Sequence, residues 1–300
     1  MTARVGVDVG GTTLRVRRFP GGPADRLEVP TAAAGGPSLA DRIAAAIEAL
    51  PAGPEPEMVG VGIPGLVDPA AGTVRHAVNL GIDGTPFPLA SVLAGRLGVP
   101  VVIENDVRTA ALGAYHHITR ERPAISDIVY VGLGTGISAG VVMGGRLHRG
   151  RHGIAGEIGH APLGDTATPC RCGLVGCLEA VAGGRALDEL LPGGAISLFT
   201  DPEAAPVRDR AVAAIARALY VLAAAYDPDV LVLGGGIAKD ATPAVRRALL
   251  DMAASSPLGG EVVSVERVIT LPPEADVGTT GAALLEPPSA TAEGRQGGNP

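Results

Sequence analysis

Apolar and glycine-rich segments recur twice along the chain in the same order. Residues 5–17 (VGVDVGGTTLRVR) and 129–142 (VYVGLGTGISAGVV) each contain an apolar stretch, a turn rich in Gly and Thr, and a second apolar stretch. This pattern predicts two β-hairpins with glycine-rich tips. Each hairpin is followed later by another apolar strand that ends in glycine, at 58–65 and at 230–236.

Each of these later strands is followed by a helix-like segment, a further strand and a last helix. The further strand and last helix fall at 100–104 and 106–117 in the first half, and at 265–270 and 277–286 in the second. Strands that alternate with helices predict mostly parallel sheets with covered faces. We therefore expect an α/β protein of two similar lobes, whose glycine-rich turns face a shared cleft.

The repeat also predicts the domain boundaries. We expect an N-terminal lobe over residues 1–118 and a C-terminal lobe over 119–286. Residues 157–185 have no counterpart in the first half and are interpreted as an insertion in the second lobe. The tail 287–300 is polar and rich in Pro and Gly, so we expect it to be disordered.

The amino-acid composition excludes some classes of binding partner. The chain of 300 residues is 46% hydrophobic and 18% charged, which provides for a sizeable core. Its net charge of -7 argues against nucleic-acid binding and against a polybasic membrane anchor. The longest apolar segment, 211–226, is shorter than the ~20 residues that span a bilayer, so we expect a buried helix. The single lysine, Lys239, fits neither a P-loop nor the strand lysine of a protein kinase.

The first glycine turn is a candidate phosphate site. It consists of Gly10, Gly11, Thr12 and Thr13. Glycine lets backbone N–H groups approach an anion without a Cβ in the way, and threonine hydroxyls add donors. Asp8 on the preceding strand suits Mg²⁺, and Arg15 can supply positive charge. An ordinary tight hairpin explains the glycines as well.

Two turns in the second half are further candidates. Gly134, Thr135 and Gly136 match the first turn, whereas Gly234, Gly235 and Gly236 follow the apolar strand VLVL. The spacing from Gly134 to Ala139 also fits a dinucleotide fingerprint, but that fingerprint requires a helix next, and SAGVVMGG reads as a strand and a turn. The third turn can pass close to a nucleobase or ribose, or simply lead into a helix.

A polar pair follows the strand VVIE. Asn105 offers a donor and an acceptor for sugar hydroxyls, and Asp106 offers a carboxylate at a helix start. Catalytic side chains collect at the carboxyl ends of strands in α/β folds. The alternative is that Asp106 only caps the helix, which stabilises a helix by about 1 kcal/mol.

A cluster of metal-ligand type lies in the predicted insertion. His160, Cys170, Cys172 and Cys177 have the spacing H-x9-C-x-C-x4-C. Three thiolates and one imidazole form a closed tetrahedral set, which predicts structural Zn²⁺ without a catalytic water. The alternative is three free cysteines beside an unrelated histidine. An odd, clustered set of cysteines and the lack of a secretory signal favour a cytoplasmic protein.

Together these motifs resemble those of the ROK family (repressor, open reading frame, kinase), in particular its glucokinase-like sugar kinases. The resemblance covers residues 4–286. It is carried by VDVGGT at 7–12, GIPGLVD at 62–68, END at 104–106, GLGTG at 132–136, GEIGH at 156–160 and CRCGLVGCLE at 170–179. It implies the actin-like and hexokinase-like (ribonuclease H-like) pair of lobes.

The resemblance also implies roles for individual residues. Asp106 matches the family's general base, and the turns at 10–13 and 134–136 match its ATP phosphate loops. The positions that match sugar-binding residues, or residues near the sugar, are Gly65, Asn79, Asn105, Glu157, His160 and Glu179. Without the resemblance, Glu157 and Glu179 could each be a solvated surface acid.

The expected activity is transfer of the ATP γ-phosphoryl group to the 6-hydroxyl of glucose or a close analogue, with Mg²⁺. Alternatives are an amino-sugar kinase such as a kanosamine kinase, a kinase of mannose, fructose or N-acetylmannosamine, and a non-catalytic sugar-binding or regulatory member of the family. The resemblance suggests a homodimer or a dimer of dimers. Arg108, near the expected sugar pocket, departs from the family pattern, in which asparagine often stands at this position after END.

Overall fold

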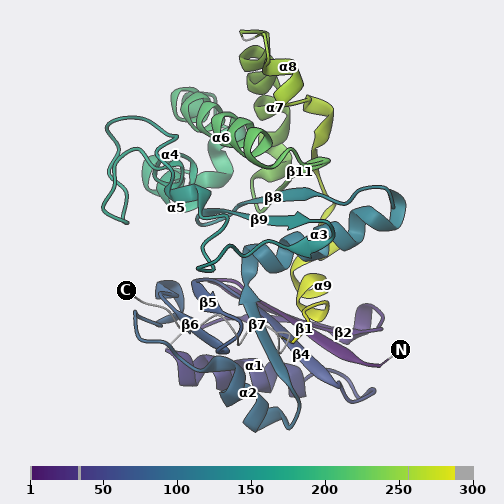
Figure 1. The fold of residues 1–300 in the computed structure, drawn as a ribbon. Coiled ribbons are helices and arrows are strands. Elements are labelled where there is room, and N and C mark those ends of the chain that lie inside the picture. The colour runs from purple at the N-terminus through teal and green to yellow at the C-terminus, as the bar shows by residue number, and fades with distance from the viewer. Residues whose placement is uncertain (1, 33–34, 256, 288–300) are drawn as a thin grey trace, which may run out of the picture. The chain divides into compact units, whose positions relative to one another are not determined.

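The computed structural model describes residues 2–32, 35–255 and 257–287. The chain divides into two compact units (Figure 1). Unit 1 comprises residues 1–113 together with the chain from Gly278 onward, and unit 2 comprises Ala114–Val277. Apart from Pro287, the tail expected at 287–300 lies outside the described residues.

Unit 1 is built on a five-stranded sheet of order β3-β2-β1-β4-β7. β1 pairs antiparallel with β2 and parallel with β4, which pairs parallel with β7. The strands are β1 (Arg4–Val9), β2 (Thr13–Phe19), β3 (Arg26–Pro30), β4 (Met58–Ile63) and β7 (Val101–Asn105). A small hairpin, β5 (Leu66–Asp68) and β6 (Thr73–Arg75), follows β4.

Helices cover both faces of this sheet. α1 (Gly36–Glu48) and α2 (Leu89–Leu97) pack on one face (Figure 1), where Val7, Ile43 and Leu93 belong to one fully buried core. The other face carries the first half of α3 (Asp106–Glu121) and α9 (Val277–Ala283).

Unit 2 repeats this topology with a sheet of order β10-β9-β8-β11-β12. β8 pairs antiparallel with β9 and parallel with β11, which pairs parallel with β12. The strands are β8 (Ile128–Leu133), β9 (Ile137–Met143), β10 (Arg146–Leu147), β11 (Val230–Gly234) and β12 (Val268–Thr270). The predicted pair of hairpins and the predicted parallel strands are therefore confirmed.

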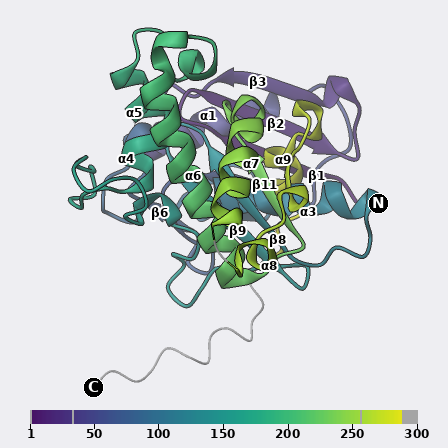
Figure 2. The same ribbon diagram turned by 90° about the horizontal axis from the view of Figure 1, so that it is seen from above.

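The helices of unit 2 are α4 (Leu178–Ala182), α5 (Gly184–Leu190), α6 (Ala205–Tyr226), α7 (Ala238–Ala254) and α8 (Gly259–Val262). α6 and α7 lie side by side in both views (Figures 1 and 2) and share one buried cluster with β8, β9 and β11. α6 contains the apolar segment expected to be a buried helix. Among the described residues no helix combines the length and apolar character that a membrane crossing requires.

Short 3₁₀ helices complete the secondary structure. They are η1 (Pro23–Asp25), η2 (Val78–Leu80), η3 (Ile158–His160), η4 (Ala195–Phe199), η5 (Pro202–Ala204), η6 (Val265–Arg267) and η7 (Pro273–Ala275).

The division differs from the expected boundary at 118 in two ways. α3 runs unbroken from Asp106 to Glu121, so its first half lies in unit 1 and its second half in unit 2. α9 follows unit 2 in sequence but packs in unit 1, where its backbone at Ala282 lies against Gly60 of β4. Because glycine has no Cβ, the helix backbone can approach the strand closely.

The third strand of each sheet was not expected. β3 is an edge strand whose residues alternate between exposed and half-buried, so it has no apolar run. β10 has two residues. Edge strands that bury little apolar surface carry a weak hydrophobic signal in the sequence.

Candidate functional site

In unit 1, the predicted site residues gather at one edge of the sheet. β1, β4 and β7 are parallel, and their register aligns Asp8 with Gly62 and Ile63 with Asn105. Parallel strands end at the same edge, which is where ligands bind in open α/β sheets. This edge therefore brings together the first glycine turn, Gly65 and the Asn105–Asp106 pair.

The first glycine turn is held by a residue that the sequence analysis did not identify. Gly10 closes the hairpin by donating its N–H to the Thr13 carbonyl at 2.8 Å. The buried Thr31 donates its backbone N–H to Thr12 O at 2.9 Å and its hydroxyl to Gly10 O at 2.7 Å. Two carbonyls of the turn are thus satisfied from one side. The local sequence around Thr31 does not predict this role, because Thr31 reaches the turn only through a tertiary contact.

Asp8, Arg15 and Glu28 form a charged ladder across three strands. Asp8 is opposite Arg15 in the β1–β2 register, and Arg15 is opposite Glu28 in the β2–β3 register. The Arg15 guanidinium lies 3.4 Å from Asp8 Oδ2 and 3.2 Å from Glu28 Oε2. The arginine expected to meet phosphate therefore also orients Asp8.

Asn105 is the residue that caps α3. Its Oδ1 accepts the N–H groups of Val107 at 3.1 Å and Arg108 at 3.2 Å, and its Nδ2 donates to Gly65 O at 3.3 Å. Asp106, the first residue of α3, accepts the N–H of the next residue, Val107, at 2.9 Å. A cap accepts N–H groups two or three residues ahead, which Asn105 does. Asn105 therefore occupies the N-cap position of α3, and Asp106 follows it as the first helical residue.

The other residues expected near the sugar in unit 1 also border this edge. Gly65 has φ of 107°, a conformation that favours glycine. Asn79 lies in η2, and its side chain borders Gly11 of the first turn. The structure thus places the candidate sugar and phosphate residues of unit 1 next to one another.

Behind this edge lies a buried ion pair. Arg108 Nη1 of α3 is 3.2 Å from Glu104 Oε1 of β7, and the two side chains are 3% and 0% exposed. Glu104 Oε1 also accepts the N–H of Asn105 at 2.9 Å. The unusual Arg108 therefore supports the strand-to-helix junction that carries Asn105 and Asp106.

In unit 2, the second glycine turn is held in a comparable way. Gly134 donates its N–H to Gly136 O at 3.1 Å. The N–H groups of Gly184 and Arg185, at the start of α5, donate to Gly134 O at 2.9 Å and Thr135 O at 3.0 Å. As in the first turn, two carbonyls are satisfied by a neighbouring segment. Orienting carbonyls away from a turn lets its N–H groups face an anion.

Glu179 connects this turn with the zinc-ligand segment. Its Oε2 accepts the N–H of Ile137, the first residue of β9, at 2.8 Å. The carboxylate packs against Gly136, where an added Cβ would collide with Oε2. The predicted sugar-binding acid therefore touches the predicted phosphate turn.

The segment that carries Glu157 and His160 packs along β9. Gly156 O accepts the N–H of Ala139 at 2.7 Å and the hydroxyl of Ser138 at 3.2 Å. η3 follows directly and ends at His160. The structure thus gathers Glu157, His160 and Glu179 around the strand that begins after the second glycine turn.

The third glycine turn lies beside the second. β8 and β11 are parallel neighbours with Gly132 opposite Gly234. Gly235 has φ of 95° and borders the carbonyl of Leu133, the residue that precedes the second turn. The turn then leads into α7, so its helix-entry role is confirmed, and its contact with a nucleotide stays a prediction.

The four predicted metal ligands converge. The ligand atoms of His160, Cys170, Cys172 and Cys177 all lie within 4.8 Å of one another. Cys172 Sγ is 3.7 Å from Cys177 Sγ, and Cys170 Sγ is 3.9 Å from His160 Nδ1. A tetrahedral zinc ion with Zn–S bonds of about 2.3 Å separates its ligands by about 3.8 Å. The donor set and its spacing fit zinc.

The pKa values of two of the thiols are shifted in opposite directions by their surroundings. A hydrogen bond from the Leu174 N–H lowers the pKa of Cys172 to about 7, whereas burial raises the pKa of Cys177 to about 12. Zinc binds thiolates, so a bound ion would displace the Cys177 proton and metal binding would release protons.

Two polar residues brace the loop between His160 and Cys170. Arg217 of α6 donates to Leu163 O at 2.8 Å and to Gly164 O at 2.6 Å. Asp165 accepts the hydroxyl of Thr168 and two backbone N–H groups, and these bonds, led by that of the hydroxyl, lower the pKa of Asp165 to about 2. The arginine that interrupts the apolar pattern of α6 thus holds the metal loop.

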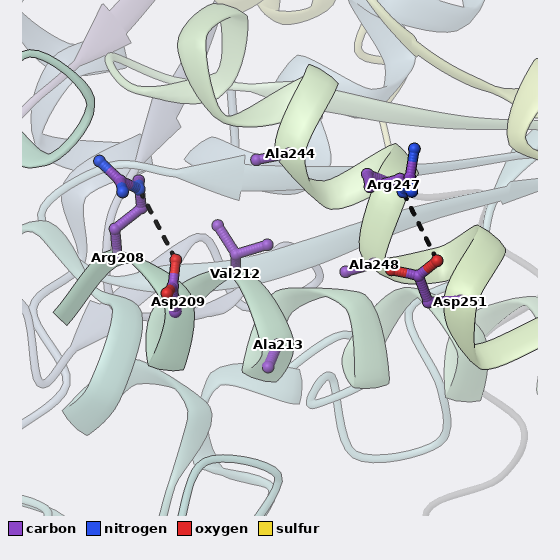
Figure 3. A pocket seen from close by; sticks show the side chains of 8 residues that line it. All are labelled: Arg208, Asp209, Val212, Ala213, Ala244, Arg247, Ala248 and Asp251. Carbon is purple, nitrogen blue, oxygen red and sulfur yellow. Dashed lines mark ion pairs between the residues drawn. The ribbon is translucent and has the colours of Figure 1, made fainter. Parts of the chain in front are cut away.

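A hollow of about 280 Å³ lies elsewhere on unit 2, over α6 and α7 (Figure 3). Its rim carries the ion pairs Arg208–Asp209 at 3.7 Å and Arg247–Asp251 at 3.5 Å. None of the predicted site residues lines it. The hollow is therefore separate from the candidate site.

Comparison with known proteins identifies the family. The model of the ROK family matches residues 4–288. A glucokinase of Thermotoga maritima is 32% identical, over 94% of this chain and 96% of its own. An N-acetylmannosamine kinase of Escherichia coli is 32% identical, over 77% of this chain and 82% of its own. The crystal structure of a ROK family glucokinase from Streptomyces griseus in complex with glucose and AMPPNP is similar, with a TM-score of 0.76 and 28% identity over 94% of this chain and 98% of that one.

The repeated sheets and these similarities define a phosphotransferase whose acceptor is an alcohol group. The chain belongs to the ROK family. The expected family, the hexokinase-like α/β fold and the activity of a sugar kinase are confirmed.

Proposed function

We propose that this sugar kinase transfers the γ-phosphoryl group of ATP to the 6-hydroxyl of glucose. The observation that carries the proposal is the division of work at the start of α3. Asn105 caps the helix, and the Asp106 carboxylate follows it directly at the carboxyl end of β7, where catalytic side chains collect in α/β folds. The similarity to glucokinases supports glucose as the acceptor.

In unit 1, Asp106 is the proposed general base. The hydroxyl oxygen of the sugar attacks the γ-phosphorus, the bond from that phosphorus to the β–γ bridging oxygen breaks, and ADP leaves. The hydroxyl proton passes to Asp106 as the new P–O bond forms. Asn105 retains one Nδ2–H beyond its bond to Gly65, which suits a sugar hydroxyl. Gly65 and Asn79 border the sugar.

The glycine turns are the proposed phosphate sites. The turns at 10–13, 134–136 and 234–236 present backbone N–H groups to the nucleotide. Asp8 is held by Arg15 at the end of β1, and one such carboxylate with substrate phosphates is a common environment for Mg²⁺. The ion would neutralise phosphate charge. The transition state is loose, so positioning and charge stabilisation supply most of the rate acceleration.

In unit 2, Glu157, His160 and Glu179 are the proposed sugar ligands. His160, Cys170, Cys172 and Cys177 hold structural zinc in this proposal, which fixes the histidine ring and the start of α4. With four protein ligands the ion has no open position, so its contribution is rigidity.

A second candidate acceptor is N-acetylmannosamine, because a kinase of that sugar is as similar in identity as the glucokinase. Amino sugars such as kanosamine remain a third. The hydroxyl and amine patterns of these sugars differ, and a polar pocket rejects analogues that leave its groups unpaired.

A coupled assay with Mg·ATP and a panel of free sugars tests the proposal. The panel is glucose, 2-amino- and 3-amino-glucose, and N-acetylmannosamine, compared by kcat/KM. We expect the highest kcat/KM for glucose. A value at least tenfold higher for another sugar would reassign the acceptor, and no turnover with any sugar would overturn the proposed activity.

A further inference from the structure

We propose that Glu179 is a positioning residue for the nucleotide turn at 134–136, in addition to its expected contact with the sugar. Through it, the sugar segment and the nucleotide turn of unit 2 are energetically coupled. The inference rests on the proposed function, in which this turn receives ATP phosphates. It goes beyond that function because it assigns one carboxylate to both substrates.

The backbone that carries Glu179 is anchored to the zinc-ligand segment. It is the second residue of α4, which begins after Cys177. Cys177 is fully buried, and Leu178, the first residue of α4, donates its N–H to Ala161 O at 2.9 Å. The segment that carries Glu179 is therefore tied to the segment that carries His160.

The Glu179 side chain contacts the end of the turn at 134–136 directly. Glu179 Oε2 accepts the Ile137 N–H at 2.8 Å, which is a charge-assisted hydrogen bond. The same oxygen packs against Gly136. Ile137 directly follows the turn, so this bond fixes the direction in which the chain leaves Gly136.

The other end of α4 makes a second connection to the same turn. Gly183 donates its N–H to Glu179 O at 2.9 Å, and the next two residues, Gly184 and Arg185, donate to the carbonyls of Gly134 and Thr135. One short stretch of chain thus holds both sides of the turn. A change in the position of Glu179 must alter the backbone that faces the nucleotide.

Direct binding of AMPPNP with Mg²⁺, measured by calorimetry without sugar, tests the proposal. Glu179→Ala removes the acceptor, and we expect nucleotide affinity to fall about tenfold, the effect of losing one hydrogen bond to a charged group. Glu179→Gln keeps an acceptor oxygen, so nucleotide affinity should stay within about threefold of the wild type. Glucose affinity should fall in both variants because the charge is lost.

Glu157→Ala is the matched control. It removes another proposed sugar ligand of the same unit, so glucose affinity should fall and nucleotide affinity should not change. The reciprocal test is Gly136→Ala, whose added methyl displaces the Glu179 carboxylate. Glucose affinity should fall in this variant although Gly136 belongs to the nucleotide turn. We expect this result because the displaced carboxylate would no longer hold its proposed contact with the sugar.

The outcomes separate the two proposals. If the wild type binds AMPPNP and Glu179→Ala binds it equally well, the coupling is overturned and the kinase function stands. If Glu179→Gln loses nucleotide affinity as fully as Glu179→Ala, the hydrogen-bond account is overturned. If the wild type does not bind AMPPNP, the proposed function itself fails. Far-ultraviolet circular dichroism confirms that each variant is folded.

Discussion

Arg108 of α3 and Glu104 of β7 form an ion pair 3.2 Å long in which both side chains are almost completely buried. The pair lies directly beneath the Asn105–Asp106 junction, because Glu104 also accepts the Asn105 N–H. Removing one member of a buried pair leaves a charge in a poorly solvated place.

Arg108→Met should therefore destabilise the protein by about 3–5 kcal/mol, since it strands the Glu104 carboxylate. The double variant Glu104→Gln with Arg108→Met should recover a large part of this loss, because it removes both charges. Urea unfolding at pH 7 measures both. A double variant less stable than the single one would show that the pair is not what stabilises the junction.

Asp106→Asn should lower kcat by about 10²–10⁴-fold, the usual contribution of a general base. Glucose affinity should stay close to that of the wild type, and so should stability, because Asn105 caps α3. Steady-state kinetics and calorimetry with glucose measure the two effects. Asp251→Asn, on the exposed end of α7, is the control and should leave kcat unchanged. Near-normal turnover of Asp106→Asn would remove its role as base.

The four converging ligands predict a defined zinc content per chain. The wild type should carry about one zinc ion per chain, and Cys172→Ser should bind zinc at least about tenfold more weakly because it removes a ligand. Leu174→Ser changes an exposed side chain in the same loop and keeps the four ligands, so its zinc content should equal that of the wild type. Elemental analysis with thermal unfolding checks both. Equal zinc content in the two variants would contradict the assignment.

The lowered pKa of Asp165 predicts that the free energy of unfolding depends on pH. Its pKa is about 2 in the folded protein and 3.8 in the ordinary case, so the ionised carboxylate stabilises the native state. That stability is fully present above about pH 4 and is lost as the pH falls towards 2. Asp165→Asn should reduce the free energy of unfolding by about 1 kcal/mol at pH 7, and the gap should close as the pH falls from 4 to 2.

Urea unfolding of the wild type and of Asp165→Asn from pH 7 down to pH 2 measures the difference in their free energies of unfolding. Asp251→Asn removes the charge of an exposed pair with Arg247, and its effect should stay within about 0.5 kcal/mol. A gap between wild type and Asp165→Asn that does not depend on pH would show that the charge of Asp165 is not responsible.

Much of the fold could be predicted because its signals are local. The two glycine-tipped hairpins follow from alternating apolar residues on either side of a turn, and the zinc ligands stand close together in sequence around Cys172. α6 follows from its apolar length. Such signals depend on neighbours within a few residues, so they survive without knowledge of the tertiary structure.

The tertiary structure alone decided how these parts support one another. Thr31 holds a turn whose residues end at Thr13, and Glu179 bonds to Ile137 across 42 residues of sequence. Asn105 occupies the cap position because α3 begins at Asp106, the residue directly after it. The sequence determined the local elements and the donor atoms. Which backbone groups those atoms satisfy depends on packing between distant segments, which no local pattern encodes.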